Sequence, residues 1–352
     1  MDKKIFKKWH KALKHAIQTR LIQIGKALLD RAPKTGHPHT PQNLQSVLFL
    51  RPDGKIGDYI VSSFAFRELK KSNPAIKIGV ICTEKNQDLF QNNPYIDHFY
   101  LVKSKSIVSY YITGKKLARQ YQIVVDPTVF TRNRDLVLLR ALAAQYNIGY
   151  LKQDYRIFNL NIHEPLLHTS ETYKRILQLC GLNNIDTRYD IPEPTDQTAV
   201  TAFLNRHQLT NYLAVNFFGA ANSRRFNQTR IEEFLHYFQQ YLPEKKIVLL
   251  TYPEVTARLQ PLSEKYENVF IYTGTRSILD SAVLIKHADW VISPDTAIIH
   301  IASGFNKKII GFYPDNAENT AYWYPNSTNE THMLFFKEHI DEISPQQLPP
   351  IR

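Results

Sequence analysis

The sequence predicts an α/β protein with two Rossmann-like, doubly wound domains that face each other across a cleft, preceded by a basic amphipathic helix. Apolar runs of strand length alternate with helix-length segments through most of the chain. The stretch Leu48–Asp58 joins an apolar strand to a helix through a glycine-bearing loop that ends in a carboxylate, and Ile292–His300 repeats this layout. Such loops are where open α/β sheets bind ligands. Two of them predict one binding cleft between two domains.

Length and cysteine content narrow the class of protein. At 352 residues the chain is long enough for two domains, each with its own core. Cys82 and Cys180 lie in apolar runs with no second ligand nearby, so we expect neither a disulfide framework nor a zinc site. No run of 18 apolar residues occurs, and charges interrupt the N-terminus every few residues. We therefore expect no membrane span and no signal peptide.

The positive charge is concentrated at the N-terminus. Net charge is +12, and residues 1–33 hold nine Lys and Arg against two Asp, a net of +7. Apolar residues recur there at three- and four-residue steps, which predicts an amphipathic helix within a segment that runs with its linker to residue 43. Such a helix suits an anionic membrane surface. Its apolar stripe could equally pack on the protein's own core.

The first domain is expected over residues 44–185. Its predicted strands are Ser46–Leu50, Lys77–Cys82, His98–Leu101, Gln122–Asp126 and Tyr146–Tyr150. The helices predicted between and after them are Tyr59–Lys71, Gln87–Asn92, Ile107–Tyr121, Arg134–Ala144 and His163–Gly181. Alternation at this spacing is typical of βαβ units and a parallel sheet.

A proline-containing connection over residues 186–195 leads to the second domain, expected over residues 196–335. Its predicted strands are Leu213–Phe217, Lys246–Leu250, Val269–Tyr272, Trp290–Ile292 and Lys308–Phe312. Its predicted helices are Gln228–Tyr241, Glu254–Tyr266, Ser277–His287 and Thr296–Ser303. The C-terminal tail, residues 336–352, is expected to pack back on the N-terminal domain.

The loop after the first strand carries the first candidate residues. Gly57 permits close approach of a ligand, and Asp58 follows it at the expected start of a helix. A carboxylate there could take a proton from an acceptor hydroxyl, but an aspartate at this position is also a common N-cap. Arg51 and Lys55 could hold an anionic acceptor or be solvated loop cations.

The corresponding loop of the second domain carries Asp295 and Thr296. They open a helix whose N–H groups suit a phosphate, and His300 lies about one turn further on the same face. Asp295 could instead be an N-cap, and a lone helical histidine is often structural. Their position at an expected ligand crevice makes the cluster a candidate site.

A polar loop, Asn216–Phe226, contains Gly219 and ends in two arginines after a predicted strand. Arg224 could neutralise a leaving diphosphate without a metal, because a planar guanidinium matches phosphate oxygens. In a basic protein it could also be an ordinary loop cation. Glu254, after the next strand, could accept hydrogen bonds from ribose hydroxyls or favour its helix as a first-turn acid.

Several familiar signatures are absent. The sequence contains no GxxxxGK[ST], GxGxxG, GxSxG or HExxH, so nucleotide binding by a P-loop, hydride transfer, serine hydrolysis and zinc hydrolysis lose their usual support. No acidic cluster suggests bound Mg²⁺. A pI of 9.4 prompts a nucleic-acid binder as the alternative from another class. The charge sits in one helix and no nucleic-acid motif occurs, so we expect no nucleic-acid partner.

Four linked motifs carry a family resemblance. They are Leu50–Ile60 with Phe66–Leu69, Asn92–Asp97, Ser293–Ala302 and Gly311–Pro314. In order and spacing, across about residues 46–330, they resemble glycosyltransferase family 9, the heptosyltransferases of the lipopolysaccharide core.

The resemblance implies a GT-B fold and inverting transfer without a metal or other cofactor. The implied donor is ADP-heptose, in the form ADP-L-glycero-β-D-manno-heptose, bound mainly by the C-terminal domain. The implied acceptor is a sugar of the lipid A-core glycolipid, bound mainly by the N-terminal domain. The enzyme would be cytoplasmic and peripheral on the anionic inner membrane. The alternative is a related transferase that uses another nucleotide sugar or another glycan acceptor.

The motifs also imply a role for each candidate residue. Asp58 falls on the catalytic base, with Arg51, Lys55 and Gly57 on the acceptor side. The implied donor contacts are Arg224 at the diphosphate, Glu254 at the ribose, Asp295 at the sugar hydroxyls, the Thr296 and Ala297 amides at the phosphates, His300 in the same motif, Gly219 in the polar loop, and Thr275, Arg276 and Ser277 near the adenine.

Three residues depart from the family pattern. Ala297 stands where glycine is usual, Arg224 where lysine is common, and Phe226 where tryptophan is common. Arginine keeps the positive charge and alanine is small, so we expect donor binding to survive these changes.

Overall fold

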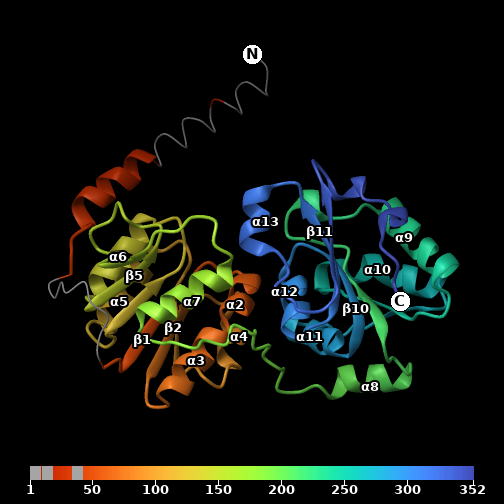
Figure 1. Ribbon diagram of the computed structural model, residues 1–352, viewed down its shortest axis with the longest axis horizontal. Helices are drawn as coiled ribbons and strands as arrows, with labels where there is room; N and C mark the ends of the chain where they lie inside the picture. The colour runs from red at the N-terminus through yellow and green to blue at the C-terminus, as the bar shows by residue number, and fades with distance from the viewer. Residues whose placement is uncertain (1–8, 10–18, 34–42) are drawn as a thin grey trace. The chain divides into compact units, whose positions relative to one another are not determined.

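The computed structural model describes residue 9, residues 19–33 and residues 43–352 (Figure 1). The chain forms two compact units, and each contains a parallel six-stranded sheet. Among the described residues, unit 1 holds the chain as far as Lys55, Ala65–Pro165 and Glu171–Asp186. Unit 2 holds Ile56–Phe64, Leu166–Ser170 and Thr187–Arg352.

The sheet of unit 1 has the strand order β3-β2-β1-β4-β5-β6. Its strands are β1 (Ser46–Leu50), β2 (Lys77–Cys82), β3 (His98–Leu101), β4 (Ile123–Asp126), β5 (Tyr146–Tyr150) and β6 (Leu160–Ile162). The helices that follow them are α3 (Phe64–Ser72), α4 (Gln87–Gln91), α5 (Ile107–Lys116), α6 (Asn133–Leu142) and α7 (Thr169–Leu179). β1, β4 and β5 are buried along their whole length, as strands covered on both faces must be.

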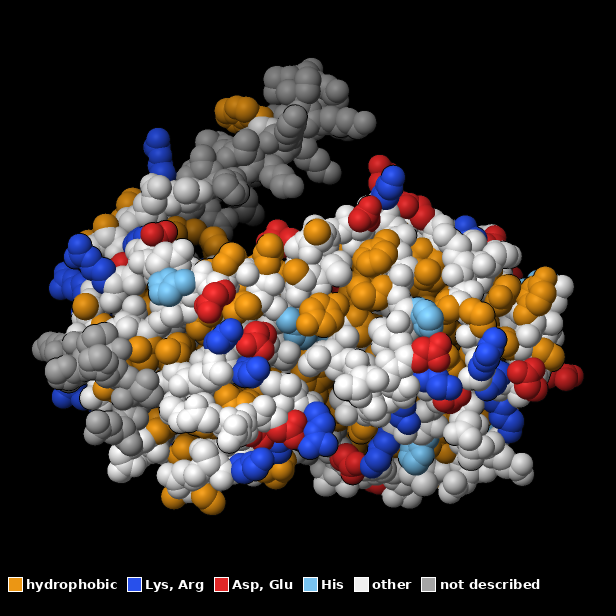
Figure 2. Space-filling model, in the orientation of Figure 1, with side chains coloured by type: hydrophobic (Ala, Val, Ile, Leu, Met, Phe, Trp, Pro, Cys, Tyr) orange, Lys and Arg blue, Asp and Glu red, His pale blue; other side chains and the backbone are white. Residues whose placement is uncertain are grey.

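Residues 19–29 form a helix that is attached to unit 1. The Asn133 side chain donates to the carbonyl of Leu21 at 2.7 Å, and Lys26 lies over the Tyr155 ring at 4.3 Å. Leu29 packs against the core, whereas the exposed apolar side chains are Leu21, Ile24 and Leu28. The rest of the predicted amphipathic helix, except residue 9, falls in residues 1–8 and 10–18, which lie outside the described residues. Figure 2 shows hydrophobic side chains exposed between charged ones on the face in view.

The sheet of unit 2 has the strand order β12-β11-β10-β7-β8-β9. Its strands are β7 (Tyr212–Val215), β8 (Ile247–Leu249), β9 (Val269–Ile271), β10 (Ala288–Pro294), β11 (Lys308–Pro314) and β12 (Thr331–Phe336). Its helices include α2 (Ile56–Ser62), α8 (Thr198–Arg206), α9 (Gln228–Tyr241), α10 (Pro253–Lys265), α11 (Ile278–His287), α12 (Ala297–Gly304) and α13 (Ala317–Trp323). In Figure 1, α9 and α10 lie on one side of this sheet and α11 and α12 on the other.

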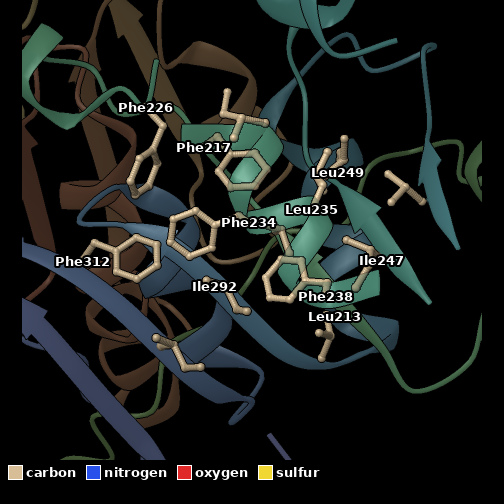
Figure 3. Close-up of a cluster of buried hydrophobic side chains, with 14 of the residues drawn as sticks. Leu213, Phe217, Phe226, Phe234, Leu235, Phe238, Ile247, Leu249, Ile292 and Phe312 are labelled. Carbon is tan, nitrogen blue, oxygen red and sulfur yellow. The ribbon is translucent and has the colours of Figure 1, made fainter. Parts of the chain in front are cut away.

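The core of unit 2 is rich in phenylalanine (Figure 3). Phe226 lies edge-on to Phe312, with ring centroids 5.5 Å apart, and 5.2 Å from Phe234. Each such pair adds about 0.5–1.5 kcal/mol beyond the burial of its apolar area. Phe226 also donates its backbone N–H to Phe217, which closes the polar loop predicted to bind the diphosphate. Phenylalanine therefore anchors this loop where tryptophan is common in the family.

Two segments belong to a different unit from the one expected. Ile56–Phe64, which includes α2, clusters with unit 2 because α2 packs against α12. The tail over residues 336–352 was expected to pack on the N-terminal domain, and this is wrong. Its apolar residues enter the core of unit 2, namely Phe336, Ile340, Ile343, Leu348 and Ile351.

No helix among residues 19–33 and 43–352 combines the length and the apolar character that a bilayer span requires.

Candidate active site

The candidate donor residues lie at one edge of the sheet of unit 2. β7 leads to β8 and β9 on one side, and the chain then returns to place β10 on the other side of β7. The crevice beside such a reversal of strand order is where doubly wound sheets bind ligands. The carboxyl end of β7 carries the polar loop with Arg224, and the carboxyl end of β10 carries Asp295. The topology thus brings these two residues to the same place.

Arg224 and Asp295 form an ion pair at this edge. Arg224 Nη1 lies 2.7 Å from the Asp295 carboxylate and also donates to the Asp295 carbonyl at 3.0 Å. Asn319, on α13, donates to the same carboxylate at 2.9 Å. Asp295 is only 6% exposed, and burial raises its pKa, while the Asn319 and Arg224 contacts act in the opposite direction. The ion pair therefore holds a carboxylate in a place that would otherwise disfavour its charge.

Gly219 shapes the loop that presents Arg224. The Gly219 N–H donates to the Arg224 carbonyl at 2.7 Å, and Arg225 Nε donates back to the Gly219 carbonyl at 2.9 Å. A Cβ on Gly219 would lie 2.5 Å from the Cβ of Arg224. Real Cβ atoms do not come so close, so the turn requires glycine. Gly219 thus acts on the candidate site through the shape of the loop that presents Arg224.

The N-terminus of α12 follows Asp295 directly. Thr296 is the N-cap, and its hydroxyl accepts from the backbone N–H of Ile298 at 3.3 Å. The Ile299 N–H donates to the Thr296 carbonyl, and the N–H groups of Thr296 and Ala297 lie at the N-terminal end of the helix. N–H groups at such a position and the helix dipole suit a phosphate oxygen.

α2 meets α12 within unit 2. A Cβ on Gly57 would lie 3.2 Å from His300 Cδ2 and 3.7 Å from the Ala297 Cα, so a glycine allows the two helices to approach. Asp58 lies in the first turn of α2, partly exposed. The predicted base and the predicted donor motif are therefore neighbours.

His300 is enclosed at this contact. It is 3% exposed, its ring lies 5.6 Å from that of Trp323, and its Nδ1 has no hydrogen-bond partner. Burial, with a smaller contribution from His168, lowers its pKa to about 3. His300 is thus a neutral imidazole at pH 7, and any contribution it makes is by packing or by hydrogen bonding.

Comparison with known proteins decides the family. The model of glycosyltransferase family 9 (heptosyltransferase) matches residues 137–344, more than half of the chain. The chain belongs to glycosyltransferase family 9. It is also 29% identical over 310 residues to "Putative lipopolysaccharide heptosyltransferase 4" of Escherichia coli K12, covering 81% of this chain and 80% of that protein. The predicted family and the assignment as a glycosyltransferase are confirmed.

Solved structures confirm the GT-B fold. A family 9 glycosyltransferase from Veillonella parvula has a TM-score of 0.70 at 17% identity, covering 88% of this chain and 97% of that chain. The E. coli heptosyltransferase WaaC with ADP-2-deoxy-2-fluoro heptose has a TM-score of 0.64 at 16% identity, covering 86% of this chain and 97% of that one.

The remaining donor candidates of this family 9 chain also follow strands of the same sheet. Glu254 is exposed on the first turn of α10, after β8. Thr275 is buried and donates to the Tyr272 carbonyl, and Ser277 is the N-cap of α11. Arg276 is exposed beside them. The side chains of Thr275 and Ser277 thus make hydrogen bonds within the fold, whereas the side chains of Glu254 and Arg276 are exposed.

The acceptor candidates Arg51 and Lys55 belong to unit 1. Arg51 is 2% exposed and donates to the Tyr173 hydroxyl at 2.7 Å and to Asp53 at 3.2 Å. Lys55 is exposed. Arg51 thus anchors the loop after β1 from inside, whereas Lys55 is accessible to a ligand.

Sequence reasoning missed a charged group in unit 1. A pocket opens between the carboxyl ends of β1 and β4, where strand order reverses, and Asp126 and Asp135 line it. Lys152 is fully buried with its Nζ 3.9 Å from Asp126. Burial, and then the charge of Asp126, raise the pKa of Asp135 to about 6. The position of Asp126 at the end of a predicted strand was the available signal.

In the part of the chain that the structure describes, no three His, Cys, Asp or Glu side chains gather as ligands for a metal ion.

Proposed function

We propose that this family 9 glycosyltransferase transfers heptose from ADP-L-glycero-β-D-manno-heptose to a sugar of the lipopolysaccharide inner core, with inversion and without a metal. One observation carries the proposal. Gly57 packs against Ala297 and His300, so Asp58 lies beside the helix that begins next to the Arg224–Asp295 pair. A base for the acceptor hydroxyl and an anion-binding group for the donor diphosphate thus lie in the same unit.

In the proposed reaction, the Asp58 carboxylate takes the proton of an acceptor hydroxyl. The oxygen then attacks the anomeric carbon from the face opposite the diphosphate, and the bond from that carbon to the phosphate oxygen breaks. Arg224 and the N–H groups at the start of α12 stabilise the charge that develops on the departing ADP. Attack from the opposite face inverts the configuration.

Asp295 contributes the second part of donor recognition. Its carboxylate is paired with Arg224. We propose that it accepts hydrogen bonds from sugar hydroxyls while Arg224 moves towards the diphosphate. Glu254 would accept from the ribose, and Arg276 would lie against the adenine. The acceptor would be held by Lys55 and by the pocket that Asp126 lines.

The decisive variant is Asp58→Ala. Loss of a positioned base and of its orientation predicts a fall in kcat of about three orders of magnitude, with ADP affinity kept. Radiolabelled heptose transfer to truncated lipopolysaccharide cores gives kcat, and calorimetry gives the Kd for ADP. Asp154→Ala, at an exposed carboxylate in unit 1, is the matched control. Near-normal turnover of Asp58→Ala would exclude this residue as the base.

Nucleotide choice is tested separately. A ligand that binds only the folded state raises the melting temperature, so ADP should give a larger increase than UDP or GDP at equal concentration. A larger shift with UDP or GDP would favour a family 9 transferase with a different donor. Full transfer activity in excess EDTA is expected, and its loss would contradict the metal-independent mechanism.

We further propose that the enzyme acts in the cytoplasm, at the anionic surface of the inner membrane where lipid A-core acceptors reside. The net charge of +7 in residues 1–33 supports this location.

A further inference from the structure

α5 exposes an apolar face that no other described element covers. Its inner face is buried against α6, with Tyr110 and Gly114 in contact with that helix. Its outer side leaves large apolar side chains in solvent at spacings of one, three and one residues. They are Ile107, Val108, Tyr111 and Ile112, each 48–61% exposed. Four such residues on one short helix are more than the scattered exposed apolar residues of an ordinary surface.

A second apolar group lies at the same end of unit 1. Val129 and Phe130, in the loop between β4 and α6, are 53% and 52% exposed. Arg134, in the first turn of α6, lies 5.5 Å from the Tyr110 ring of α5. The two helices therefore begin side by side, and the loop that carries Val129 and Phe130 leads into the start of α6.

The helix over residues 19–29 adds a third apolar stripe. Asn133, the first residue of α6, donates to the Leu21 carbonyl, so this helix also reaches the start of α6. Its exposed apolar side chains are Leu21, Ile24 and Leu28. Three elements that meet near the start of α6 thus carry exposed apolar side chains.

The charged side chains on α5 and in the segments on either side of it are all positive. Between Asp97 and Asp126 the sequence contains no Asp or Glu, but five Lys and Arg. Lys103 and Lys105 are exposed just before α5, and Lys115 lies over the Tyr111 ring at 5.8 Å. A cation with an apolar stem beside an exposed apolar side chain is the arrangement that an interfacial helix uses at an anionic bilayer.

We propose that the outer face of α5, with the Val129–Phe130 loop and the helix over residues 19–29, docks on an anionic lipid bilayer. The apolar side chains enter the boundary between head groups and acyl chains, and the lysines contact lipid phosphates. The charge favours lipid over a second copy of the chain, because two copies facing each other here would bring like charges together. The proposal rests on the proposed location at an anionic membrane surface, but it does not depend on transferase activity, since binding to lipid needs no substrate.

The test is co-sedimentation of the full-length chain with phosphatidylcholine vesicles, with and without phosphatidylglycerol. Wild type should bind only when phosphatidylglycerol is present. The double variant Val108→Gln, Ile112→Gln should bind about tenfold more weakly or worse, since it removes two apolar side chains from the docking face. Lys103→Gln, Lys105→Gln should weaken binding at low salt and lose this effect at high salt.

The matched control is Tyr241→Gln, Phe335→Gln, which replaces two exposed apolar residues of unit 2. It should bind as wild type, and the melting temperatures of all variants should agree within a few degrees. The proposal is overturned if the α5 variant binds vesicles as wild type does. It is also overturned if that variant changes only self-association in sedimentation velocity, which would make the face a contact between two copies. Deletion of residues 1–33 measures how much of the vesicle binding comes from the N-terminal segment.

Discussion

The Asp295 carboxylate accepts hydrogen bonds from two groups that lie far apart in the sequence, Arg224 and Asn319. The family resemblance predicted Asp295 and Arg224 as donor residues, because both occur in loops with recognisable spacing. It could not predict that they bind each other, which depends on β7 and β10 being neighbours. Nothing in the sequence indicated a role for Asn319. Its helix, α13, was not predicted, because it is short and has no buried residue.

Asn319 is expected to act as a positioning residue for the donor site. Asn319→Ala removes a hydrogen bond to a charged group, worth about 1.5–3 kcal/mol, so the KM for the sugar-nucleotide should rise roughly tenfold. We expect kcat to change much less. Steady-state kinetics with varied donor measures both constants. Glu318→Ala, an exposed neighbour on the same helix, should leave both unchanged. A fall in kcat without a change in KM would contradict a role in donor binding.

Two buried histidines make stability depend on pH. Burial lowers the pKa of His168 to about 4 and that of His300 to about 3, both below the ordinary value of 6.5. Between these values and 6.5 the unfolded chain binds more protons than the folded chain. The stability that comes from burying these two histidines as neutral side chains is therefore fully present above pH 6.5. It is lost as the pH falls from 6.5 towards their pKa values in the folded state. The raised pKa of Asp135 acts in the opposite sense, since the folded state retains its proton up to about pH 6.

His168→Gln should reduce this dependence. In the wild type, the His168 ring hydrogen-bonds to the Ser170 hydroxyl and to the Tyr324 carbonyl. The variant loses this arrangement and should therefore be less stable at pH 7. It should lose less stability than wild type between pH 6.5 and pH 4. Urea midpoints at a series of pH values provide the measurement. Equal slopes for the two proteins would show that His168 does not titrate in the manner expected from its burial.

At the scale of elements, the contact between α2 and α12 is the arrangement on which the proposed chemistry depends. The sequence predicted a helix after each glycine- or aspartate-bearing loop, and both helices are present. The contact between α2 and α12 was not predictable, because it joins segments more than 230 residues apart. It also depends on Gly57, and nothing in the residues around this glycine indicates a helix contact. Ala297, which departs from the family pattern, lies at this contact.

Gly57→Leu tests that contact. A Cβ here already lies 3.2 Å from His300, so a larger side chain must push α2 away from α12. We expect transfer activity to fall about a hundredfold, as for a small displacement of catalytic groups, while ADP affinity is retained. Gly57→Ala should show an intermediate loss. Kinetics and calorimetry on both variants distinguish this pattern, and unchanged activity in Gly57→Leu would show that close packing is not required.

For the whole molecule, alternation of strands and helices was sufficient to predict both sheets and the family of the fold. The undetected elements have specific reasons. β6 has three residues, and β12 is an edge strand with mostly half-buried side chains, so neither shows a strong apolar pattern. The grouping of segments into compact units also escaped prediction, because periodicity says nothing about which core a given apolar face enters.

The position of the C-terminal tail has a consequence for stability. Ile340 is fully buried in the core of unit 2, so Ile340→Ala should lower the free energy of unfolding by about 2–5 kcal/mol. Urea denaturation followed by circular dichroism measures the loss. Ile112→Ala, at an exposed position, should change stability by no more than about 0.5 kcal/mol. An equally small effect at Ile340 would mean that the tail is not part of that core.

The ion pair between Arg224 and Asp295 bears on which solutes can compete with the donor. A cell contains abundant simple anions, and an unpaired arginine beside a helix N-terminus would attract all of them. Here an anion must replace a carboxylate that already lies 2.7 Å from the guanidinium, and it leaves that carboxylate buried without its cation. Inorganic phosphate has no sugar hydroxyls that could donate hydrogen bonds to the Asp295 carboxylate. A sugar-nucleotide brings hydroxyls for Asp295 together with phosphates for Arg224, so the ion pair favours a ligand that carries both groups over a simple anion.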